Sequence, residues 1–159
     1  PKPFTGVSAN GHHHHFTLID DEGTNVFHDP DGPAQLSETA RYFLGGMLEH
    51  FPALMCVGNP TVNSYVRMWD TGFWAPIYKN WGWQNRTTTV RVASGGRFEY
   101  RGVDSSCNPY LTVATLLRAG TGRGPEAGSD DDGHEQKSSP TRTPTIDHRP
   151  CSAALAGAL

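Results

Sequence analysis

The stretch "TTTVRVASGGRFEYRGV", residues 87–103, decides the fold. Its two halves alternate apolar and polar side chains with the period of two that is typical of a β-strand. "SGG" lies between the halves and suits a tight hairpin turn. The stretch therefore predicts two antiparallel strands. Arg91 is isolated between apolar neighbours in the first strand, and Arg97, Glu99 and Arg101 share one face of the second.

Two helices are expected beside this hairpin. Apolar residues at helical spacing predict one amphipathic helix, which Pro52 ends. These apolar residues are Leu36, Ala40, Phe43, Leu44, Met47, Leu48 and Phe51. The stretch "NPYLTVATLLRAG" predicts a second helix, in which Asn108 is the cap, Pro109 lies in the first turn and Gly120 lies just past the end.

The remaining part of the chain completes a coarse view of the fold. Residues 59–82 contain Gly, Pro, Asn and aromatic residues without an obvious period, which predicts a long loop. Strands and helices that are segregated in this way indicate an α+β fold, with an antiparallel sheet and helices packed on one face.

Length and composition limit the class of protein. The 159 residues suffice for one domain with a real core. A net charge of −3, without a basic run, gives no indication of a nucleic-acid or membrane partner. Three cysteines without paired spacing support neither a disulfide scaffold nor a zinc ribbon, and they favour a reducing, cytoplasmic compartment.

The composition changes after Gly120. Residues 121–159 contain an acidic run at 130–132, several prolines and little apolar periodicity. Such a segment buries too little apolar surface to offset the entropy that ordering costs. We therefore expect one ordered domain at 1–120 and a disordered, low-complexity tail at 121–159.

Four consecutive histidines, in "GHHHHF" at 11–16, precede Phe16 in a stretch that has strand character. Because side chains alternate along a strand, His13 and His15 share one face and His12 and His14 the other. At most two histidines can then reach one site. A histidine run on its own is also compatible with a solvated surface strand, so the site requires partners from elsewhere in the chain.

Charged residues supply those partners. A carboxylate flanked by arginines, as in Glu99, is either part of a structural ion-pair ladder or part of an anion site that also binds a metal. The second interpretation gains support from the whole set, which suits a substrate with phosphates and carboxylates together with a divalent metal. The set comprises Arg67, Arg86, Arg91, Arg101, His13, His15 and Glu99.

Several motifs together resemble the catalytic domain of glutamine synthetases. They are "PKPF", "NGHHHH", "NPTVNSYVR", "APIYKNWGWQNRTTTVRV", "FEYR" and "NPYLTVATLLRAG", and they span residues 1–120 in the order found in the family. The resemblance implies an ATP-dependent ligase of nitrogen metabolism. Such an enzyme joins the γ-carboxylate of glutamate to ammonia through γ-glutamyl phosphate, requires Mg²⁺ or Mn²⁺, and works as a homo-oligomeric ring.

The resemblance also implies roles for individual residues. His13 and Glu99 match ligands of one metal ion, and His15 and Thr17 match nucleotide contacts. The arginines that hold glutamate correspond to Arg67 and Arg101, and Gly11 matches the glycine of the glutamate-binding loop. Arg86 and Arg91 match arginines near the phosphates, which gives Arg86 a catalytic role as well.

The sequence departs from the family pattern at three places. "ANG" replaces the usual Gly-Ser-Gly before the histidines, and the short "ASGG" lacks a lysine that contacts phosphate in the family. In "GFWAP", Trp74 occupies the position of a flap glutamate. A tryptophan ring accepts no proton, although it can hold an ammonium by a cation–π contact of ~0.5–2 kcal/mol.

These departures leave several interpretations open. Trp69, Trp74, Trp81 and Trp83 either pin a loop to the core or to a neighbouring subunit, or form an apolar pocket for an alkylated amine. The alternatives are therefore a γ-glutamyl-amine ligase for a small alkylamine or polyamine, and a non-catalytic pseudo-enzyme that keeps the fold. A simple histidine metal module is disfavoured, because it has no use for the arginines.

The resemblance implies that much of the enzyme lies outside this sequence. Family members carry an N-terminal domain, and further carboxylate ligands lie upstream of "PKPF". After "RAG" the family continues with Leu-Asp-Gly, whereas here "TGRG" follows, as a single-base shift of the reading frame would produce. We therefore expect a truncated portion that is inactive alone, with a frameshift-derived tail.

Overall fold

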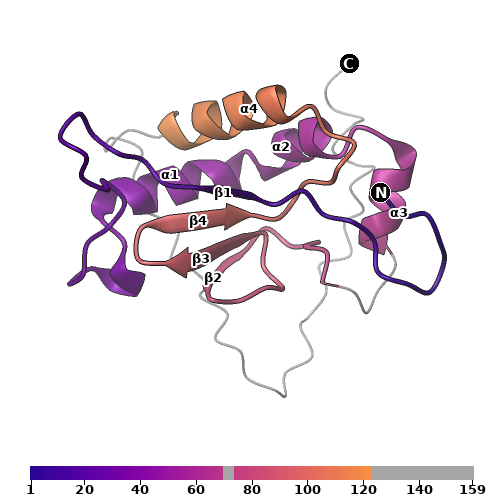
Figure 1. Cartoon of the computed structure of the whole chain (residues 1–159), viewed down its shortest axis with the longest axis horizontal. Helices are drawn as coiled ribbons and strands as arrows, with labels where there is room; N and C mark the ends of the chain where they lie inside the picture. Colours follow the sequence, from indigo (N-terminus) through magenta and orange to yellow (C-terminus); the bar gives the residue numbers. More distant parts are fainter. Residues whose placement is uncertain (70–73, 123–159) are drawn as a thin grey trace.

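A computed structural model describes residues 1–69 and 74–122, which form a helical layer on one face of a four-stranded sheet (Figure 1). The expected α+β class is confirmed. Residues 123–159, nearly all of the segment expected to be a disordered tail, lie outside the described residues, as do residues 70–73. The helices are α1 (Glu38–Glu49), α2 (Phe51–Gly58), α3 (Val62–Trp69) and α4 (Pro109–Thr121), with a short 3-10 turn η1 (Pro33–Gln35). The strands are β1 (His14–Phe16), β2 (Trp81–Trp83), β3 (Val90–Ser94) and β4 (Arg97–Tyr100).

The predicted hairpin forms the centre of the sheet, whose strand order is β1-β4-β3-β2. β3 and β4 are antiparallel, with Arg91 opposite Glu99, and a register shift between Val92 and Ser94 lies next to the turn. Gly96 has a φ of 71°, a left-handed conformation that glycine adopts without strain. β1 is also antiparallel to β4, and His15 lies opposite Glu99.

The expectation of a purely antiparallel sheet is wrong at one edge, because β2 runs parallel to β3. The connection at 84–89 is short for a parallel pair, which usually requires a longer crossover. Two features shape this connection. Gln84 has a φ of 51°, and the side-chain oxygen of Asn85 accepts a hydrogen bond from the Thr87 amide at 2.9 Å. Alternation along a short strand is the same in both directions, so it carries no information about strand direction.

The two faces of the sheet have different surroundings. Val90, Val92, Phe98 and Tyr100 are fully buried and belong to the same core cluster as apolar residues of α1, α2 and α4. The alternate positions carry the charged side chains of β3 and β4 to the opposite face. This division, which the alternation predicted, leaves one face of the sheet available for polar chemistry.

The single helix expected from Leu36 to Phe51 is in fact two helices. Ser37 caps α1, and its hydroxyl accepts a hydrogen bond from the Ala40 amide at 3.1 Å. The backbone leaves helical geometry at His50, and α2 then begins with Pro52 in its first turn. Proline has no N–H to donate, and its φ suits the first turn of a helix. Pro52 therefore lies at the start of a second helix, and the chain continues as a helix after it.

Residues 59–82 are not one long loop, because they contain α3 and β2. Val62, Tyr65, Val66 and Trp69 do recur at helical spacing, but they lie on the exposed side of α3. Its buried side contains Arg67, with Ser64 and Met68. The helix was missed because its polar side faces inward, the reverse of the usual pattern.

The last helix agrees with its predicted signals at the start but not at the end. The side-chain oxygen of Asn108 accepts hydrogen bonds from the amides of Tyr110 at 3.0 Å and Leu111 at 3.3 Å. Gly120 lies inside α4 and does not follow it. It serves packing, because a Cβ at Gly120 would lie 2.3 Å from the Phe43 ring of α1, and a Cβ at Gly46 would lie 2.3 Å from the Ala119 carbonyl oxygen.

Two further findings concern the described residues only. Helices in this part of the chain are all too short or too polar to cross a membrane. Cys56 and Cys107 are both free thiols, and Cys56 is exposed.

Candidate functional site

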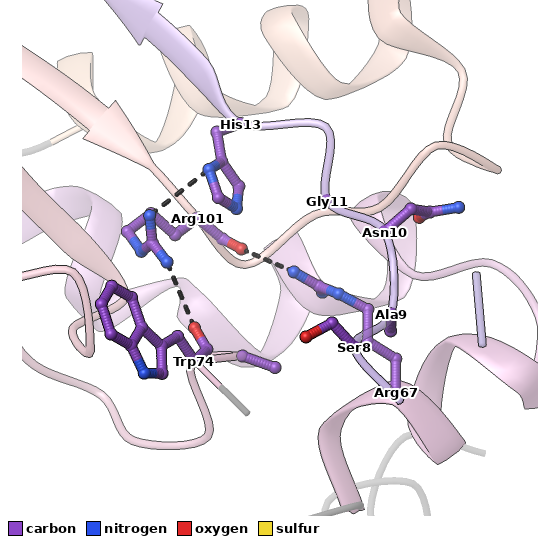
Figure 2. Close-up of a pocket in the computed structure, with 9 residues that line it drawn as sticks. Ser8, Ala9, Asn10, Gly11, His13, Arg67, Trp74 and Arg101 are labelled. Atoms are coloured by element: carbon purple, nitrogen blue, oxygen red, sulfur yellow. Dashed lines mark hydrogen bonds between the residues drawn. The ribbon is translucent and has the colours of Figure 1, made fainter. Parts of the chain in front are cut away.

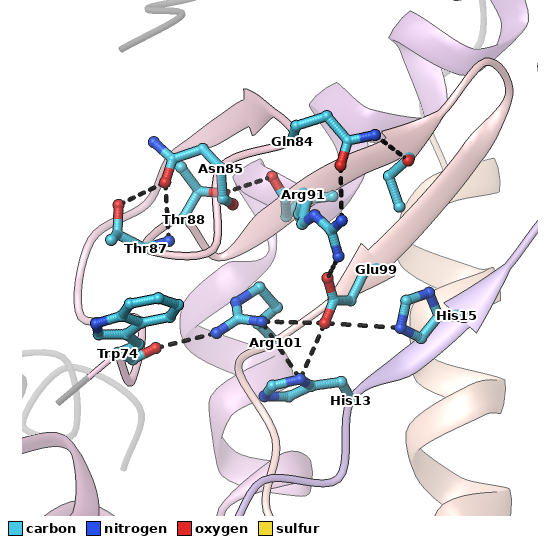
Figure 3. A network of polar contacts seen from close by, with 12 residues as sticks. His13, His15, Trp74, Gln84, Asn85, Thr87, Thr88, Arg91, Glu99 and Arg101 are labelled. Atoms are coloured by element: carbon cyan, nitrogen blue, oxygen red, sulfur yellow. Dashed lines mark hydrogen bonds and ion pairs between the residues drawn. The ribbon is translucent and has the colours of Figure 1, made fainter. Parts of the chain in front are cut away.

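The odd-numbered histidines and Glu99 meet on the charged face of the sheet (Figure 3). Nδ1 of His13 lies 3.0 Å from Oε1 of Glu99, and Nε2 of His15 lies 3.6 Å from the same oxygen. The rings of His12 and His14 lie next to one another instead, with centroids 5.1 Å apart. The alternation therefore separated the two pairs correctly.

Two arginines flank the carboxylate. Nη1 of Arg101 donates to Oε1 of Glu99 at 3.0 Å, and Nη1 of Arg91 donates to Oε2 at 2.7 Å. Arg91 is held in turn by Gln84, whose side-chain oxygen accepts from Nη2 of Arg91 at 2.6 Å. The ion-pair ladder therefore exists, and it also fixes the side chains that point toward the adjacent pocket.

The surroundings fix the protonation of His13 and Glu99. Burial lowers the pKa of His13 to about 4, and the positive charge of Arg101 adds to this effect, so the imidazole is neutral at pH 7. Burial alone would raise the pKa of Glu99, but the hydrogen bond from Arg91 and the charge of Arg101 lower it overall. The pair is thus a neutral nitrogen donor next to an ionised carboxylate.

A pocket of about 300 Å³ opens beside this network (Figure 2). Its walls come from the loop before β1, from α3, from the end of β4 and from the segment that leads to β2. Nine residues line it: Ser8, Ala9, Asn10, Gly11, His13, Arg67, Trp74, Ala75 and Arg101. The loop approaches closely, because a Cβ at Gly11 would lie 2.6 Å from Nε2 of His13.

The pocket contains two buried guanidinium groups. Arg67 is 3% exposed and Arg101 is 4% exposed, and burial lowers the pKa of both. Nη2 of Arg67 donates to the Arg101 carbonyl oxygen at 3.3 Å. Among the described residues, Nη1 of Arg67 and Nε of Arg101 have no hydrogen-bond acceptor. Buried donors without acceptors are costly, so the site suits an anion that would supply them.

Trp74 contributes both its backbone and its ring to this pocket. Its carbonyl oxygen accepts a hydrogen bond from Nη2 of Arg101 at 3.2 Å, and its side chain is 63% exposed at the rim. The preceding residues of "GFWAP", Gly72 and Phe73, lie outside the described residues. Trp74 is therefore attached to the site through its main chain, while its ring remains accessible to a ligand.

The chain is similar in sequence to known proteins. The family profile described as the glutamine synthetase catalytic domain matches residues 1–150. The glutamine synthetase of Halobacterium salinarum is 49% identical over 124 residues, which are 76% of this chain. The chain belongs to the glutamine synthetase family.

Other members of the glutamine synthetase family agree with this assignment. The enzymes of Methanosarcina mazei and Thermotoga maritima are each 46% identical over 76% of the chain. Among solved structures, a GmaS–ADP complex matches with a TM-score of 0.72 and 42% identity, over 77% of this chain and 29% of that one. The chain spans about a quarter of the length of these curated relatives, 27% of the Halobacterium enzyme.

Members of the glutamine synthetase family are typically ATP-dependent, metal-dependent ligases, and the chain's donor set is compatible with part of a metal site. Neutral imidazole and ionised carboxylate are the protonation states in which these side chains bind a divalent metal. However, no group of three or more His, Cys, Asp or Glu side chains within residues 1–69 and 74–122 is arranged to hold an ion. His13 and Glu99 can supply two ligands to a metal ion. A complete site needs further ligands from outside the described residues.

The other predicted residues lie outside the pocket wall. His15 and Arg91 contact Glu99 behind it, and Arg86 is exposed on the loop before β3. Thr17 is in a local network, where its hydroxyl lies 2.6 Å from Oδ1 of Asn25 and 2.8 Å from the Gly96 carbonyl oxygen. The roles implied for these residues remain predictions.

Sequence reasoning gave no site role to five residues. Ser8, Ala9, Asn10 and Ala75 line the pocket, and Gln84 positions Arg91. None of them carries a distinctive signal in the sequence, since their importance comes from backbone proximity. The left-handed φ of Gln84, 51°, would point to a special position, but only the structure reveals it.

Proposed function

We propose that this chain is a portion of an ATP-dependent ligase that joins the γ-carboxylate of glutamate to ammonia. The observation that supports this best is the pocket with two buried guanidinium groups, which lies next to His13 and Glu99. Family membership supports the reaction class, and the two buried guanidinium groups support the binding of an anion in the pocket.

Arg67 and Arg101 bind glutamate in this proposal. Each has a buried N–H without an acceptor among the described residues, so a carboxylate would complete both groups. Charge-assisted hydrogen bonds of this kind are short, strong and directional. A Cβ at Gly11 would lie 2.6 Å from Nε2 of His13, so a larger residue there would displace the His13 ring.

Arg86 and Arg91 are the proposed contacts for the phosphate groups of ATP, with His15 and Thr17 toward the nucleotide. The γ-carboxylate oxygen attacks the terminal phosphorus of ATP and releases ADP. Ammonia then attacks the acyl carbon of γ-glutamyl phosphate, the phosphate group leaves, and the nitrogen loses a proton. Arg86 stabilises charge on the transferring phosphoryl group in this scheme.

His13 and Glu99 would hold Mg²⁺ or Mn²⁺, which when bound offsets the negative charge of phosphate and carboxylate. Their protonation is already suitable, because the low pKa of His13 keeps its ring neutral. Arg91 and Arg101 hold the carboxylate of Glu99 in position.

The full-length enzyme, meaning the longer protein whose catalytic domain contains this segment, is required for activity in this proposal. The chain spans only 27% of its Halobacterium relative, and its two metal-ligand candidates form an incomplete site. We further propose a homo-oligomeric, cytoplasmic enzyme, and an isolated chain without ligase activity.

A second candidate, a γ-glutamyl-amine ligase, is favoured by one observation. Trp74 stands at the flap position and its exposed ring borders the pocket. An aromatic ring offers a better surface for the methylene groups of an alkylamine or polyamine than for ammonium. The GmaS structures do not decide between the candidates, because their identities of 42% and 43% lie below those of the curated glutamine synthetases.

The proposal is tested by ADP release. We expect the full-length enzyme to release ADP from ATP only when glutamate and ammonia, or glutamate and an amine, are both present, with one amide formed per ADP. The isolated 159-residue chain is the matched control, and we expect no turnover from it. A full-length enzyme that binds ATP and glutamate but forms no amide would support the pseudo-enzyme alternative instead.

A further inference from the structure

Asn10 and Gly11 form the only Asn-Gly pair in the sequence, and both residues line the pocket. Both are exposed and lie outside any helix or strand. In an Asn-Gly pair, the backbone nitrogen of the glycine is not shielded by a side chain. It can therefore reach the side-chain carbonyl carbon of the asparagine more easily than in other pairs.

The surroundings of this pair suit attack by that nitrogen. Oδ1 of Asn10 accepts a hydrogen bond from the backbone N–H of Ser105 at 3.3 Å. A donor on this oxygen withdraws electrons from the carbonyl carbon and stabilises the oxyanion that an attack produces. Among the described residues, the Gly11 amide has no backbone or side-chain acceptor, whereas the Asn10 amide donates to the Pro1 carbonyl oxygen at 2.9 Å.

We propose that Asn10 is a site of spontaneous deamidation in the wall of the pocket. The Gly11 nitrogen loses its proton and forms a bond to Cγ of Asn10, the bond from Cγ to Nδ2 breaks, and ammonia leaves with the proton. The product is a succinimide ring. Solvent water then adds to one of the two ring carbonyl groups and breaks one C–N bond, which yields either aspartate or isoaspartate. No oxidant or reductant is involved.

Both products change the pocket. Each replaces a neutral amide with a carboxylate in the lining of the pocket that contains the guanidinium groups of Arg67 and Arg101, so its negative charge opposes the binding of an anion. Isoaspartate also inserts a methylene group into the main chain before Gly11. Gly11 lies close to His13, because a Cβ there would lie 2.6 Å from Nε2 of His13, so a shift of Gly11 would also disturb that ring.

The first experiment measures the reaction on the whole 159-residue chain. The chain is incubated at neutral and mildly alkaline pH, and peptide mapping by mass spectrometry follows each asparagine, with isoaspartate separated from aspartate by chromatography. We expect conversion at Asn10 to be faster than at the other asparagines and to accelerate with pH. Asn59 and Asn108 are internal controls, because each precedes a proline that has no N–H to attack.

The second experiment tests the part played by the fold. Ser105 is the second residue of a turn in which the Cys107 amide donates to the Asp104 carbonyl oxygen at 3.2 Å. Proline is favoured at that position of a turn, so Ser105→Pro removes the N–H donor with little disturbance. Ser105→Ala is the matched control, because it keeps the N–H. We expect Ser105→Pro to slow conversion at Asn10 by about two- to tenfold relative to Ser105→Ala.

Asn10→Gln provides a check on the pathway, since its longer side chain would have to form a six-membered ring. We expect it to remain unmodified. A comparison with the urea-denatured chain shows whether the fold favours deamidation. We expect Asn10 to react at least as fast in the folded chain as in urea. The proposal is overturned if Asn10 stays intact in the folded chain while it reacts in urea, or if Ser105→Pro and Ser105→Ala react equally.

Discussion

Nδ1 of His13 lies 3.0 Å from Oε1 of Glu99, although the two residues are far apart in the sequence. The contact exists because β1 adds to the free edge of the hairpin, in the register that places His15 opposite Glu99. The carboxylate of Glu99 also accepts hydrogen bonds from Arg91 and Arg101. One acidic residue thus joins the proposed metal site to the proposed anion pocket.

His13→Ala should weaken the binding of Mn²⁺ to the full-length enzyme, by about tenfold or more, because it removes a nitrogen ligand. The matched control is His12→Ala, whose side chain is exposed and lies on the other face of the strand. We expect no loss of affinity from the control. Calorimetric titration with Mn²⁺ gives both values, and equal losses would refute the assignment of the odd-numbered face.

The stability of the isolated chain should fall as the pH falls below 6.5. The folded state holds the pKa of His13 at about 4, whereas the unfolded value is close to 6.5, so the unfolded chain binds more protons between these values. This contribution is fully present above pH 6.5 and is lost progressively toward pH 4. Thermal unfolding between pH 7 and pH 5 measures it.

The variant His13→Gln should show a smaller decrease in Tm over the same pH interval. His50→Gln, which changes an exposed histidine between α1 and α2, is the control and should retain the slope of the unmodified chain. If His13→Gln has the full slope, protonation of His13 does not limit stability in this range.

Gly46→Ala should destabilise the fold, because the new Cβ would lie 2.3 Å from the Ala119 carbonyl oxygen of α4. Gly120→Ala should act similarly through the Phe43 ring. Overpacking of this kind costs about 1–3 kcal/mol, which is more than the helix propensity that alanine gains. Urea denaturation measures the loss. Gly122→Ala is the control, since its Cβ would come no closer than 3.2 Å to another atom.

Arg67→Met tests whether Arg67 serves glutamate binding as well as stability. The variant removes a buried guanidinium that attracts the buried Asp104 side chain and donates to the Arg101 carbonyl oxygen, so the Tm of the isolated chain should fall. The affinity of the full-length enzyme for glutamate should fall roughly ten- to hundredfold, as expected from the loss of a charged hydrogen bond. Arg97→Met, at an exposed position of β4, is the control for both measurements. A large decrease in Tm with unchanged glutamate affinity would make Arg67 a structural residue.

Trp74→Glu tests the second candidate function, which expects the full-length enzyme to prefer primary alkylamines and the variant to shift that preference toward ammonia. One or two methylene groups buried on the ring contribute ~1–2 kcal/mol, or roughly tenfold or more in preference. The measurement is kcat/KM for ammonia and for a panel of primary amines. Trp69→Glu is the control, because Trp69 is 83% exposed on α3 and does not line the pocket. An enzyme that favours ammonia tenfold, unchanged by Trp74→Glu, would leave Trp74 without a selective role.

The sequence by itself determined those features that depend on neighbouring residues. Alternation along the hairpin and along the histidine run decided which side chains share a face, so His13, His15 and Glu99 were grouped correctly. The cap at Asn108 marked the start of α4, since its side chain bonds to amides only two and three residues away. Such signals are local, and local geometry follows from local chemistry.

Only the tertiary structure decided the features that depend on what a segment packs against. It turned the apolar side of α3 outward and buried Arg67, because the polar side of that helix faces the pocket. It placed β2 parallel to β3, and it gave Gly120 a packing role against Phe43 where the sequence suggested a helix end. It also brought Trp74 to the pocket through a hydrogen bond between its carbonyl oxygen and Arg101. The physical reason is the same in each case: burial and close approach are properties of pairs of segments, and one segment's pattern does not contain its partner.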